Sequence, residues 1–420
     1  MKVNPTTASG RKRSLLAIGA IATVATLGLA GCAAGDSGDE TPAGSTLTIW
    51  VDANRADALK DVIQTFEDDN GVTVKVVQKE FGDTLKEDFT KQVPTGKGPD
   101  VVVGAHDWLG GWVQNGVVAP LTVDNAGDFQ EVATQAMSYE GQQYGLPVSI
   151  ENVALIRNTD LDPESHDTFD EMIQAGEKVV AAGDAEFPFI VQVGANSDPY
   201  HLYPLQTSFG APVFGTNADG SYNPDDLQLG NAGGDKFAAK LVEWGKSGVL
   251  NISVDGDIAI ENFVNKKSPY IITGPWNLPR IKEAGINYSI EEIPSAGGEP
   301  SQPFVGVQGF FVSSKTENAL LANKFVVEYL GSEEVQTAIF EAGGRAPALK
   351  TAFDAAQSNE DVAAFGAVGA AGVPQPSIPA MGQVWSDWGA TQAALIAGSA
   401  GDPTAAWQKM VETIATKIKG

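Results

Sequence analysis

Strand and helix patterns alternate along the first third of the chain, and this alternation limits the possible folds more than any other feature. Strand patterns cover residues 46–51, 72–77 and 101–103. Amphipathic helix patterns lie between them, at residues 56–69 and about 84–93. Such an alternation predicts a mainly parallel sheet with helices on both faces, and therefore an α/β fold class.

The third of these strands ends in residues that suit a binding crevice. After Val103 come two small residues, then His106, Asp107 and Trp108. Ligands of open α/β sheets bind beyond the carboxyl ends of the strands. Asp107 can accept hydrogen bonds from hydroxyl groups, and the indole of Trp108 offers a flat apolar face, so the pair suits a neutral polyhydroxylated ligand. The alternative is structural, with Asp107 capping the next helix and Trp108 packed in the core.

Two long apolar stretches predict strands that cross between domains. Residues 144–156 run longer than an ordinary strand and carry Glu151 in the middle. A carboxylate inside an apolar strand is costly unless it is paired, so we expect Glu151 to face a wet cleft. Residues 303–312 predict a second crossing strand. A chain of 420 residues also exceeds what one core usually holds, which favours two domains built from discontinuous segments.

A second series of elements surrounds these crossings. Helix patterns cover residues 169–182, 232–247, 317–330 and 333–342, and strand patterns cover 188–193 and 270–273. The Pro-rich residues 373–379 must be extended, and two helices are expected to finish the chain.

The N-terminus predicts export and lipid attachment. Four basic residues precede an apolar run that ends at Gly31 and is followed by Cys32, the only cysteine of the chain. The sequence around Cys32 resembles the lipobox of bacterial lipoproteins. We therefore expect a signal peptide over 1–31, a lipid on Cys32, a flexible tether over 32–45 and a membrane anchor on the extracytoplasmic face. The alternatives are an uncleaved anchor helix and an ordinary secretory signal.

Composition excludes several classes of function. The formal net charge is −26, which disfavours nucleic acid as a partner. One cysteine permits no internal disulfide, and three histidines without metal-site spacing give no reason to expect a metal. The GxGxxG, GxxxxGK[ST] and GxSxG motifs are missing from the sequence, so we expect no cofactor and no catalytic residues.

Six passages resemble the extracellular solute-binding proteins of ABC sugar importers, and among these the maltose/maltodextrin-binding proteins. They are LTIWV, GPDVVVGAHDWLGGWVQNG, YGLPVSIENVALIRNTDL, GPWNLPRI, QPFVGVQGFFVSS and IPAMGQVWSDWG. The resemblance covers residues 46–420 and implies a two-lobed periplasmic-binding-protein-like fold (type II). Each lobe would be a mainly parallel sheet flanked by helices, with residues 46–150 and 306–352 in the N-lobe and 151–305 and 353–420 in the C-lobe. Crossing hinge strands would join the lobes.

The same resemblance implies a set of ligand-binding residues in the cleft. Polar contacts would come from Asn54, Arg55, Glu87, Asp107, Glu151 and Asp198, and aromatic faces from Trp108, Tyr200, Trp276 and Trp385. The chain departs from the best-known family pattern at Gly104, Gln375, Ser386 and Gly389. Arg345 is interpreted as a loop-ordering residue. The remaining tryptophans are assigned to core packing: Trp50, Trp112, Trp244, Trp388 and Trp407.

The resemblance also implies a function. A monomeric protein would bind maltose/maltodextrin-type α-glucosides by hinge closure and deliver them to the transmembrane subunits of the importer, without breaking a bond. Three alternatives remain: a binding protein for another oligosaccharide such as trehalose or sucrose, one for a dicationic solute such as spermidine, and a secreted glycoside hydrolase. A hydrolase would need two carboxyl groups flanking one bond.

Overall fold

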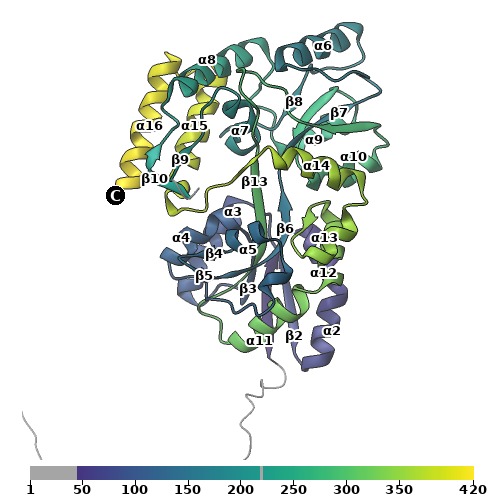
Figure 1. Cartoon of the computed structure of the whole chain (residues 1–420), viewed down its shortest axis with the longest axis vertical. Coiled ribbons are helices and arrows are strands. Elements are labelled where there is room, and N and C mark those ends of the chain that lie inside the picture. The colour runs from purple at the N-terminus through teal and green to yellow at the C-terminus, as the bar shows by residue number, and fades with distance from the viewer. Residues whose placement is uncertain (1–44, 218–220) are drawn as a thin grey trace, which may run out of the picture. The chain divides into compact units, whose positions relative to one another are not determined.

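The computed structural model of the protein describes residues 45–217 and 221–420. The expected signal peptide, Cys32 and nearly all of the expected tether lie outside these residues. In the described ranges, no helix combines the length and the hydropathy that a membrane span requires. The described chain has an α/β fold with two main sheets, each flanked by helices (Figure 1).

The first sheet has seven strands in the order β14-β6-β13-β3-β1-β2, with β15 also paired to β13. Its strands are β1 (Thr46–Val51), β2 (Thr73–Gln78), β3 (Val101–Ala105), β6 (Gly145–Glu151), β13 (Phe304–Val312), β14 (Ala346–Pro347) and β15 (Val373–Pro374). β1 is parallel to β2 and β3, whereas β13 lies antiparallel between β3 and β6. The sheet is therefore mixed, and the expectation of a mainly parallel sheet is wrong because a strand from late in the sequence inserts in the opposite direction.

The second sheet has four strands in the order β12-β7-β11-β8. They are β7 (Ala154–Asn158), β8 (Ile190–Val191), β11 (Tyr270–Thr273) and β12 (Tyr288–Glu291). β7 is antiparallel to both of its neighbours, and only β8 and β11 are parallel, so this sheet is mixed too. Two hairpin-like pairs lie outside the main sheets: β4 (Ser138–Tyr139) with β5 (Gln142–Gln143), and β9 (Phe214–Thr216) with β10 (Tyr222–Leu227).

Eight α-helices belong to the sequence segments of the first sheet: α1 (Ala53–Ala58), α2 (Lys60–Asn70), α3 (Asp83–Gln92), α4 (Leu109–Gln114), α5 (Glu131–Ala136), α11 (Ala319–Lys324), α12 (Glu333–Gly343) and α13 (Lys350–Ala356). The other α-helices of the described chain are α6 (Phe169–Ala182), α7 (Pro199–Thr207), α8 (Ala232–Ser247), α9 (Gly256–Val264), α10 (Leu278–Glu283), α14 (Glu360–Ala370), α15 (Trp385–Ile396) and α16 (Pro403–Lys419). Local capping explains the clearest of them. Thr168 and Glu171 form a capping box at the start of α6, and Gly183 ends the helix in the left-handed conformation.

Two helix patterns are interrupted in the structure. The predicted helix over 56–69 is two helices, α1 and α2, that meet at Leu59. The predicted helix over 317–330 is α11 followed by a π-helical segment, Phe325–Leu330. Short 3₁₀ turns also matter for the site: η2 (His106–Trp108), η4 (Pro275–Asn277) and η6 (Pro379–Gln383).

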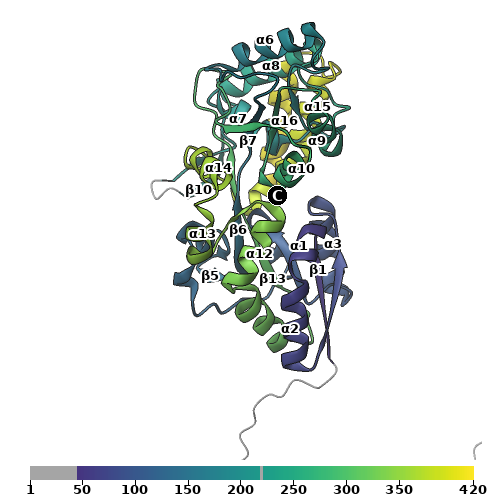
Figure 2. The ribbon, with the colours of Figure 1, turned by 90° about the vertical axis from the view of Figure 1, so that its right-hand side faces the viewer.

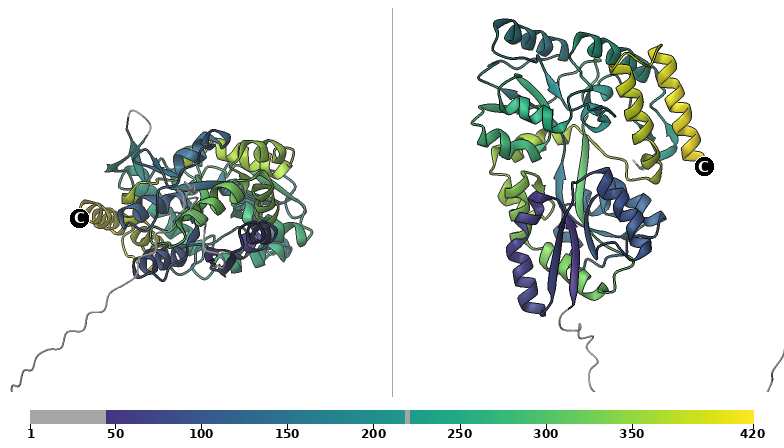
Figure 3. Two further views of the ribbon diagram at one scale, coloured as in Figure 1. Left: turned by 90° about the horizontal axis from the view of Figure 1, so that it is seen from below. Right: turned by 180° about the vertical axis from the view of Figure 1, so that it is seen from behind.

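Separate apolar cores pack around the two sheets. The first core takes its buried residues from 47–148 and 307–352. Two further clusters take theirs from 153–304 and 365–414. The five tryptophans assigned to packing are all buried, which confirms that prediction. Toward the C-terminus α16 contacts α15, and both contact α8 (Figure 3).

Three crossings connect the two sheets. β6 ends at Glu151, and after two residues the chain enters β7 of the second sheet, so the long apolar stretch is two strands of different sheets. β13 starts at Phe304, whose ring stacks on Tyr203 in the second core, while Val307 onward packs in the first core. Both predicted crossings are confirmed, and β6 and β13 run side by side (Figure 2). The third crossing lies between α13, whose Ala352 packs in the first core, and α14, whose Phe365 and Val368 pack in a cluster of the second sheet. The segment that contains β15 comes after this crossing and pairs with the start of β13.

Candidate functional site

A chain of polar side chains runs from the start of α1 across the middle of β13 to the end of β6. Gln308 of β13 donates from Nε2 to Glu151 Oε1 and accepts from Arg55 Nη2, and Arg55 in turn pairs with Asp52. Arg345 donates from Nε to Glu151 Oε2. We call Asp52, Arg55, Gln308, Glu151 and Arg345 the polar chain. Glu151 was expected to face a wet cleft, but its side chain is only 11% exposed and is paired with Arg345 and Gln308.

The two ends of the polar chain are held by local structure. Asp52 caps the N-terminus of α1 and accepts a hydrogen bond from the backbone of Arg55 at 3.2 Å. Burial works to raise the pKa of the Asp52 carboxyl, but the Arg55 guanidinium beside it outweighs burial and lowers that pKa. Arg55, which we expected to contact ligand, is 2% exposed and already bound on two sides. Its geometry is that of a support for Gln308.

Arg345 lies closer to the expected ligand residues than sequence reasoning suggested. Its guanidinium carbon is 5.3 Å from the centroid of the Trp276 ring, a cation–π distance. Its neighbour Gly344 has φ +68, and a Cβ there would lie 2.7 Å from the carbonyl oxygen of Pro275. Glycine therefore permits this close approach. The glycine pair before Arg345 was the only local signal for its position.

Three partly exposed aromatic residues gather beside the polar chain. The Tyr200 and Trp276 ring centroids are 6.5 Å apart, and both Tyr200 and Trp385 pack on Phe304, at 6.2 and 6.1 Å. Trp385 also stacks on buried Trp388. A Cβ at residue 274 would lie 2.0 Å from the Trp276 ring, so the glycine before this turn lets the indole fold back. We call Tyr200, Trp276 and Trp385 the aromatic group.

The Tyr200 hydroxyl is the most telling atom of the aromatic group. It is buried and, within the described part of the chain, has no hydrogen-bond partner. Burial, with the negative charge of Glu151 nearby, raises the pKa of Tyr200 well above its usual value, so the phenol keeps its proton. A buried donor without a partner costs about 1–3 kcal/mol and is available to a ligand.

Asp198 and His201 pack against the aromatic group. Asp198 caps α7, accepting from the His201 backbone N–H at 3.1 Å and from Gln192 Nε2. Burial works to raise the pKa of Asp198, but His201 and these hydrogen bonds lower it. The His201 ring stands edge-on to Trp276 at 5.8 Å.

Asp107 and Trp108 occupy the η2 turn after β3. The N-cap residue of η2 is Ala105, and no side chain forms a capping hydrogen bond there. The alternative in which Asp107 caps the helix is therefore wrong. Asp107 is 7% exposed, and burial raises its pKa. Trp108 is 6% exposed, stacks on Phe81 at 4.9 Å and belongs to the first core, as its structural alternative held. Phe81 in turn lies under the Arg55 guanidinium.

Two expected residues stand apart from this arrangement. Asn54 is exposed on α1, and Glu87 is exposed on α3, where it pairs with Lys91 at 2.6 Å. Among the described residues, no hydrogen bond or ion pair joins either one to the polar chain. Their surroundings are those of ordinary helix surface.

The departures from the family pattern have packing explanations at the two glycines. A Cβ at Gly104 would lie 2.6 Å from the Trp112 ring, and one at Gly389 would lie 2.5 Å from the carbonyl oxygen of Asn196. Gln375 is 8% exposed and its carbonyl accepts from the His106 ring, whereas Ser386 is exposed.

The site as a whole offers flat apolar faces beside hydrogen-bond donors and acceptors. Over the described ranges, no cluster of three or more His, Cys, Asp or Glu side chains could hold a metal ion. Such a surface suits a ligand with apolar ring faces and many hydroxyl groups.

Comparisons with known proteins agree with this chemistry. The sequence matches the family described as bacterial extracellular solute-binding protein over residues 61–366. It is 30% identical over 394 residues to the galactooligosaccharide-binding protein of Bacillus subtilis, covering 91% of this chain and 92% of that protein. It is 32% identical over 369 residues to a maltodextrin-binding protein of the same organism, covering 83% and 86%.

A solved structure is similar over nearly the whole described fold. The maltotriose-binding protein of Thermus thermophilus, bound with maltotriose, superimposes with a TM-score of 0.81 at 30% sequence identity. The match covers 89% of this chain and all of that one. The chain belongs to the family of bacterial extracellular solute-binding proteins.

Proposed function

We propose that this chain is the extracytoplasmic sugar-binding component of an ABC importer and that it binds maltose/maltodextrin-type α-glucosides. The observation that carries the proposal is the contact between the aromatic group and the polar chain, where Arg345 joins Glu151 to the face of Trp276. The names of a maltodextrin-binding relative and of a maltotriose-binding structural neighbour support the same class of ligand.

The chemistry of a sugar fits both halves of this arrangement. The C–H faces of its rings pack on Tyr200, Trp276 and Trp385. Its hydroxyl groups need partners, because a buried hydroxyl left unpaired costs about 1–3 kcal/mol. Glu151, Asp107 and Asp198 supply acceptors, while Arg345 and the Tyr200 hydroxyl supply donors. These residues form the proposed site.

Binding would proceed by hinge closure. We propose that residues 46–150 with 306–352 and residues 151–305 with 353–420 form two lobes that move about the three crossings. A sugar that touches both lobes favours the closed form only by its difference in affinity for the two states. A micromolar complex needs roughly −8 kcal/mol, which a few stacked rings and a set of hydroxyl bonds can supply.

A galactooligosaccharide is the second candidate ligand, because a relative with that name is 30% identical over 91% of this chain. Isothermal titration calorimetry of maltose, maltotriose, trehalose, sucrose, lactose and β-1,4-galactotriose separates the candidates, with spermidine as the dicationic comparison. We expect maltotriose to bind most tightly. Tightest binding of galactotriose would replace maltodextrin with the second candidate, and binding of spermidine alone would overturn the sugar proposal.

The proposal includes no bond cleavage. Maltotriose incubated for a day with the pure protein should be recovered intact by chromatography. Release of glucose or maltose at a rate proportional to protein concentration would favour the glycoside hydrolase instead.

Attachment to the membrane is a separate part of the proposal. A monomeric protein held by a lipid on Cys32 would present its two lobes to the importer's transmembrane subunits. Cys32→Ser expressed in a bacterial host should move the protein from the detergent phase to the aqueous phase in Triton X-114 partition. Unchanged partition of that variant would reject the lipid anchor and leave sugar binding untouched.

A further inference from the structure

One buried histidine holds three chain segments together where the crossings meet. His106 follows β3 and is 2% exposed. The backbone N–H of Val307 in β13 donates to its Nδ1 at 3.1 Å, and Nε2 lies 2.9 Å from the carbonyl oxygen of Gln375. Segments that are some 200 and 269 positions away in sequence therefore meet on one ring.

These contacts define which nitrogen carries the proton. A backbone N–H can only donate, so Nδ1 accepts from Val307 and the ring hydrogen belongs on Nε2. Nε2 then donates to the Gln375 carbonyl. Nδ1 also lies 3.3 Å from the Val307 carbonyl, a longer approach that leaves the assignment unchanged. The neutral ring satisfies two backbone groups that would otherwise be buried without partners.

The position of the ring in the sheet explains what it does. Along one edge, β13 pairs with β3 from Gln308 onward and with β15 at Phe304 and Val305. His106 fills the interval between these two pairings. On its other edge β13 pairs with β6, Val307 opposite Ile150. The strand β6 and the segment that contains β15 are thus both tied to β13, and the ring makes a further link to that segment.

We propose that His106 is a positioning residue of the hinge, which ties the segment after β15 to β3 and β13 so that this segment and the crossing strands β6 and β13 bend as one unit around bound sugar. The inference rests on the proposed function for its sugar and its closing motion. The tie itself does not depend on that function. Asp107, the next residue and a proposed sugar contact, is held in place by the same bonds.

Three substitutions of His106 test the two hydrogen bonds of its ring separately. His106→Leu removes both. His106→Asn offers an amide oxygen near the position of Nδ1, and His106→Gln offers an amide N–H near that of Nε2. Val103→Ala is the control, because Val103 is fully buried in the same strand and lies outside the proposed site.

The bond from the Val307 amide to His106 is tested by hydrogen exchange of that amide in protein without added sugar. The effect on binding is measured as maltotriose affinity by calorimetry. We expect exchange at least tenfold faster in the Leu and Gln variants and near wild type in the Asn variant. We expect maltotriose affinity at least fivefold weaker in the Leu and Asn variants, which lose the bond to Gln375, and within twofold of wild type in the Gln variant and in Val103→Ala.

Two results would overturn the inference: unchanged Val307 exchange in His106→Leu, or an affinity loss in Val103→Ala as large as that in His106→Leu. The first would mean that the ring does not hold the strand. The second would mean that any loss of core packing weakens binding. If the wild-type protein binds no sugar of the panel, the proposed function fails, and the Val307 exchange still decides whether His106 is the tie.

Discussion

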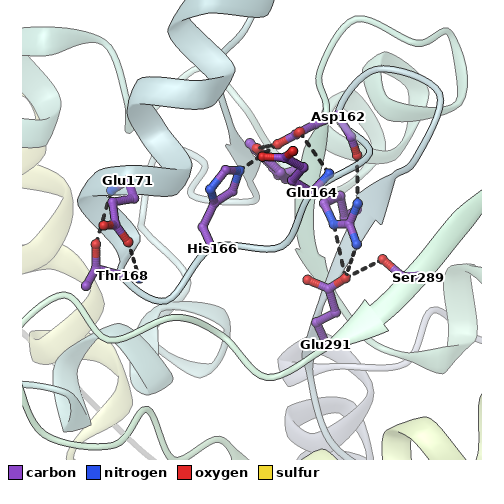
Figure 4. A network of polar contacts seen from close by, with 9 residues as sticks. Asp162, Glu164, His166, Thr168, Glu171, Ser289 and Glu291 are labelled. Carbon is purple, nitrogen blue, oxygen red and sulfur yellow. Dashed lines mark hydrogen bonds and ion pairs between the residues drawn. The ribbon is translucent and has the colours of Figure 1, made fainter.

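Two polar networks of this molecule are each built on an arginine and a glutamate, and they differ in what they leave unpaired. One is the polar chain, which ends on Trp276. The other, the Asp162 cluster, lies beside the second sheet (Figure 4) and consists of Arg157, Asp162, His166, Tyr270, Ser289 and Glu291.

In the Asp162 cluster the hydrogen-bonding capacity is largely used. Arg157 donates to Glu291 from Nε and Nη2 and to the Asp162 carbonyl from Nη1. The Asp162 carboxylate accepts from His166 at 2.7 Å, from the Tyr270 hydroxyl and from a backbone N–H. None of its buried side-chain polar atoms lacks a partner among the described residues. The cluster therefore has a structural role, holding β7, the loop after it and β12 together.

Beside the polar chain the opposite holds. Arg55 Nε and the Tyr200 hydroxyl are buried without partners among the described residues, and three aromatic rings stay partly exposed. Groups that the fold leaves unsatisfied cost stability, and a ligand that satisfies them recovers that cost as affinity. The two networks therefore differ less in charge than in how many of their buried hydrogen-bonding groups have partners. This saturation of hydrogen bonds separates a structural cluster from a candidate site. Substitutions in one network should therefore change stability, and in the other affinity.

The largest effect is expected in the saturated network. Arg157→Met removes the cation from partly buried Glu291 and leaves Asp162 with fewer partners. Breaking a buried ion pair by removing one partner costs about 3–5 kcal/mol, to be measured as the free energy of unfolding in urea. Maltotriose affinity below the unfolding range should stay within twofold. Lost affinity with unchanged stability would place the Asp162 cluster in the binding site and end the comparison.

Trp276→Ala tests the unsaturated network. Loss of its ring face should weaken maltotriose binding at least tenfold, about 1.4 kcal/mol or more, because stacking and the Arg345 contact are lost together. The fold should persist, since Trp276 is only partly buried. Trp244→Phe is the control: Trp244 is 3% exposed in the second core, so its substitution should lower stability and leave affinity near wild type. Unchanged affinity in Trp276→Ala would remove Trp276 from the site.

The parts of the fold that were predictable from sequence have local signals. The helices Phe169–Ala182 and Ala232–Ser247 have the predicted bounds, because Thr168 and Asn231 cap their starts and left-handed glycines end them. Strand β11 was predicted with its bounds because four residues of types that favour strands, Tyr-Ile-Ile-Thr, stand between turn residues. Strand direction has no such local signal. The insertion of β13 between β3 and β6 is decided by residues some 150 to 200 positions away, and so the mixed sheets were missed.

The candidate site divides in the same way. Glu151 and Trp276 were noticed because each breaks a local rule, an acid in an apolar strand and a tryptophan after a Gly-Pro break. Arg345 and His106 break none. Their contacts with Trp276, Val307 and Gln375 arise only when distant segments meet. Sequence reasoning therefore gave Arg345 to loop ordering and assigned His106 no role.

Asp107→Asn tests stability and affinity at a single residue of the proposed site. Burial raises the pKa of Asp107, so the folded protein disfavours the charged form of this carboxyl group. The protonated form contributes stability below the unfolded pKa, and that contribution is lost as pH rises through the raised folded value. The uncharged amide should therefore increase the free energy of unfolding at pH 7, and this gain should shrink toward pH 4. Affinity for maltotriose should fall about fivefold, since an amide offers one oxygen in place of the two oxygens of the carboxyl group. A variant that binds as well as wild type would exclude Asp107 from the site.

The smallest effect concerns acid sensitivity of the Asp162 cluster. Burial works to raise the pKa of Asp162, but the hydrogen bonds from Tyr270 and His166 outweigh it and lower the pKa from its usual 3.8. A depressed folded pKa contributes stability above the unfolded value, and this contribution is lost as pH falls through the folded value. The stability difference between wild type and Asp162→Asn should therefore be constant from pH 7 to 5 and shrink below pH 4, in urea unfolding followed by circular dichroism. Maltotriose affinity at pH 7 should be equal in the two proteins. A stability difference that does not change with pH would mean that the charge of the Asp162 carboxylate adds no stability and that the cluster acts through packing alone. Saturation by charged groups would then no longer distinguish the two networks.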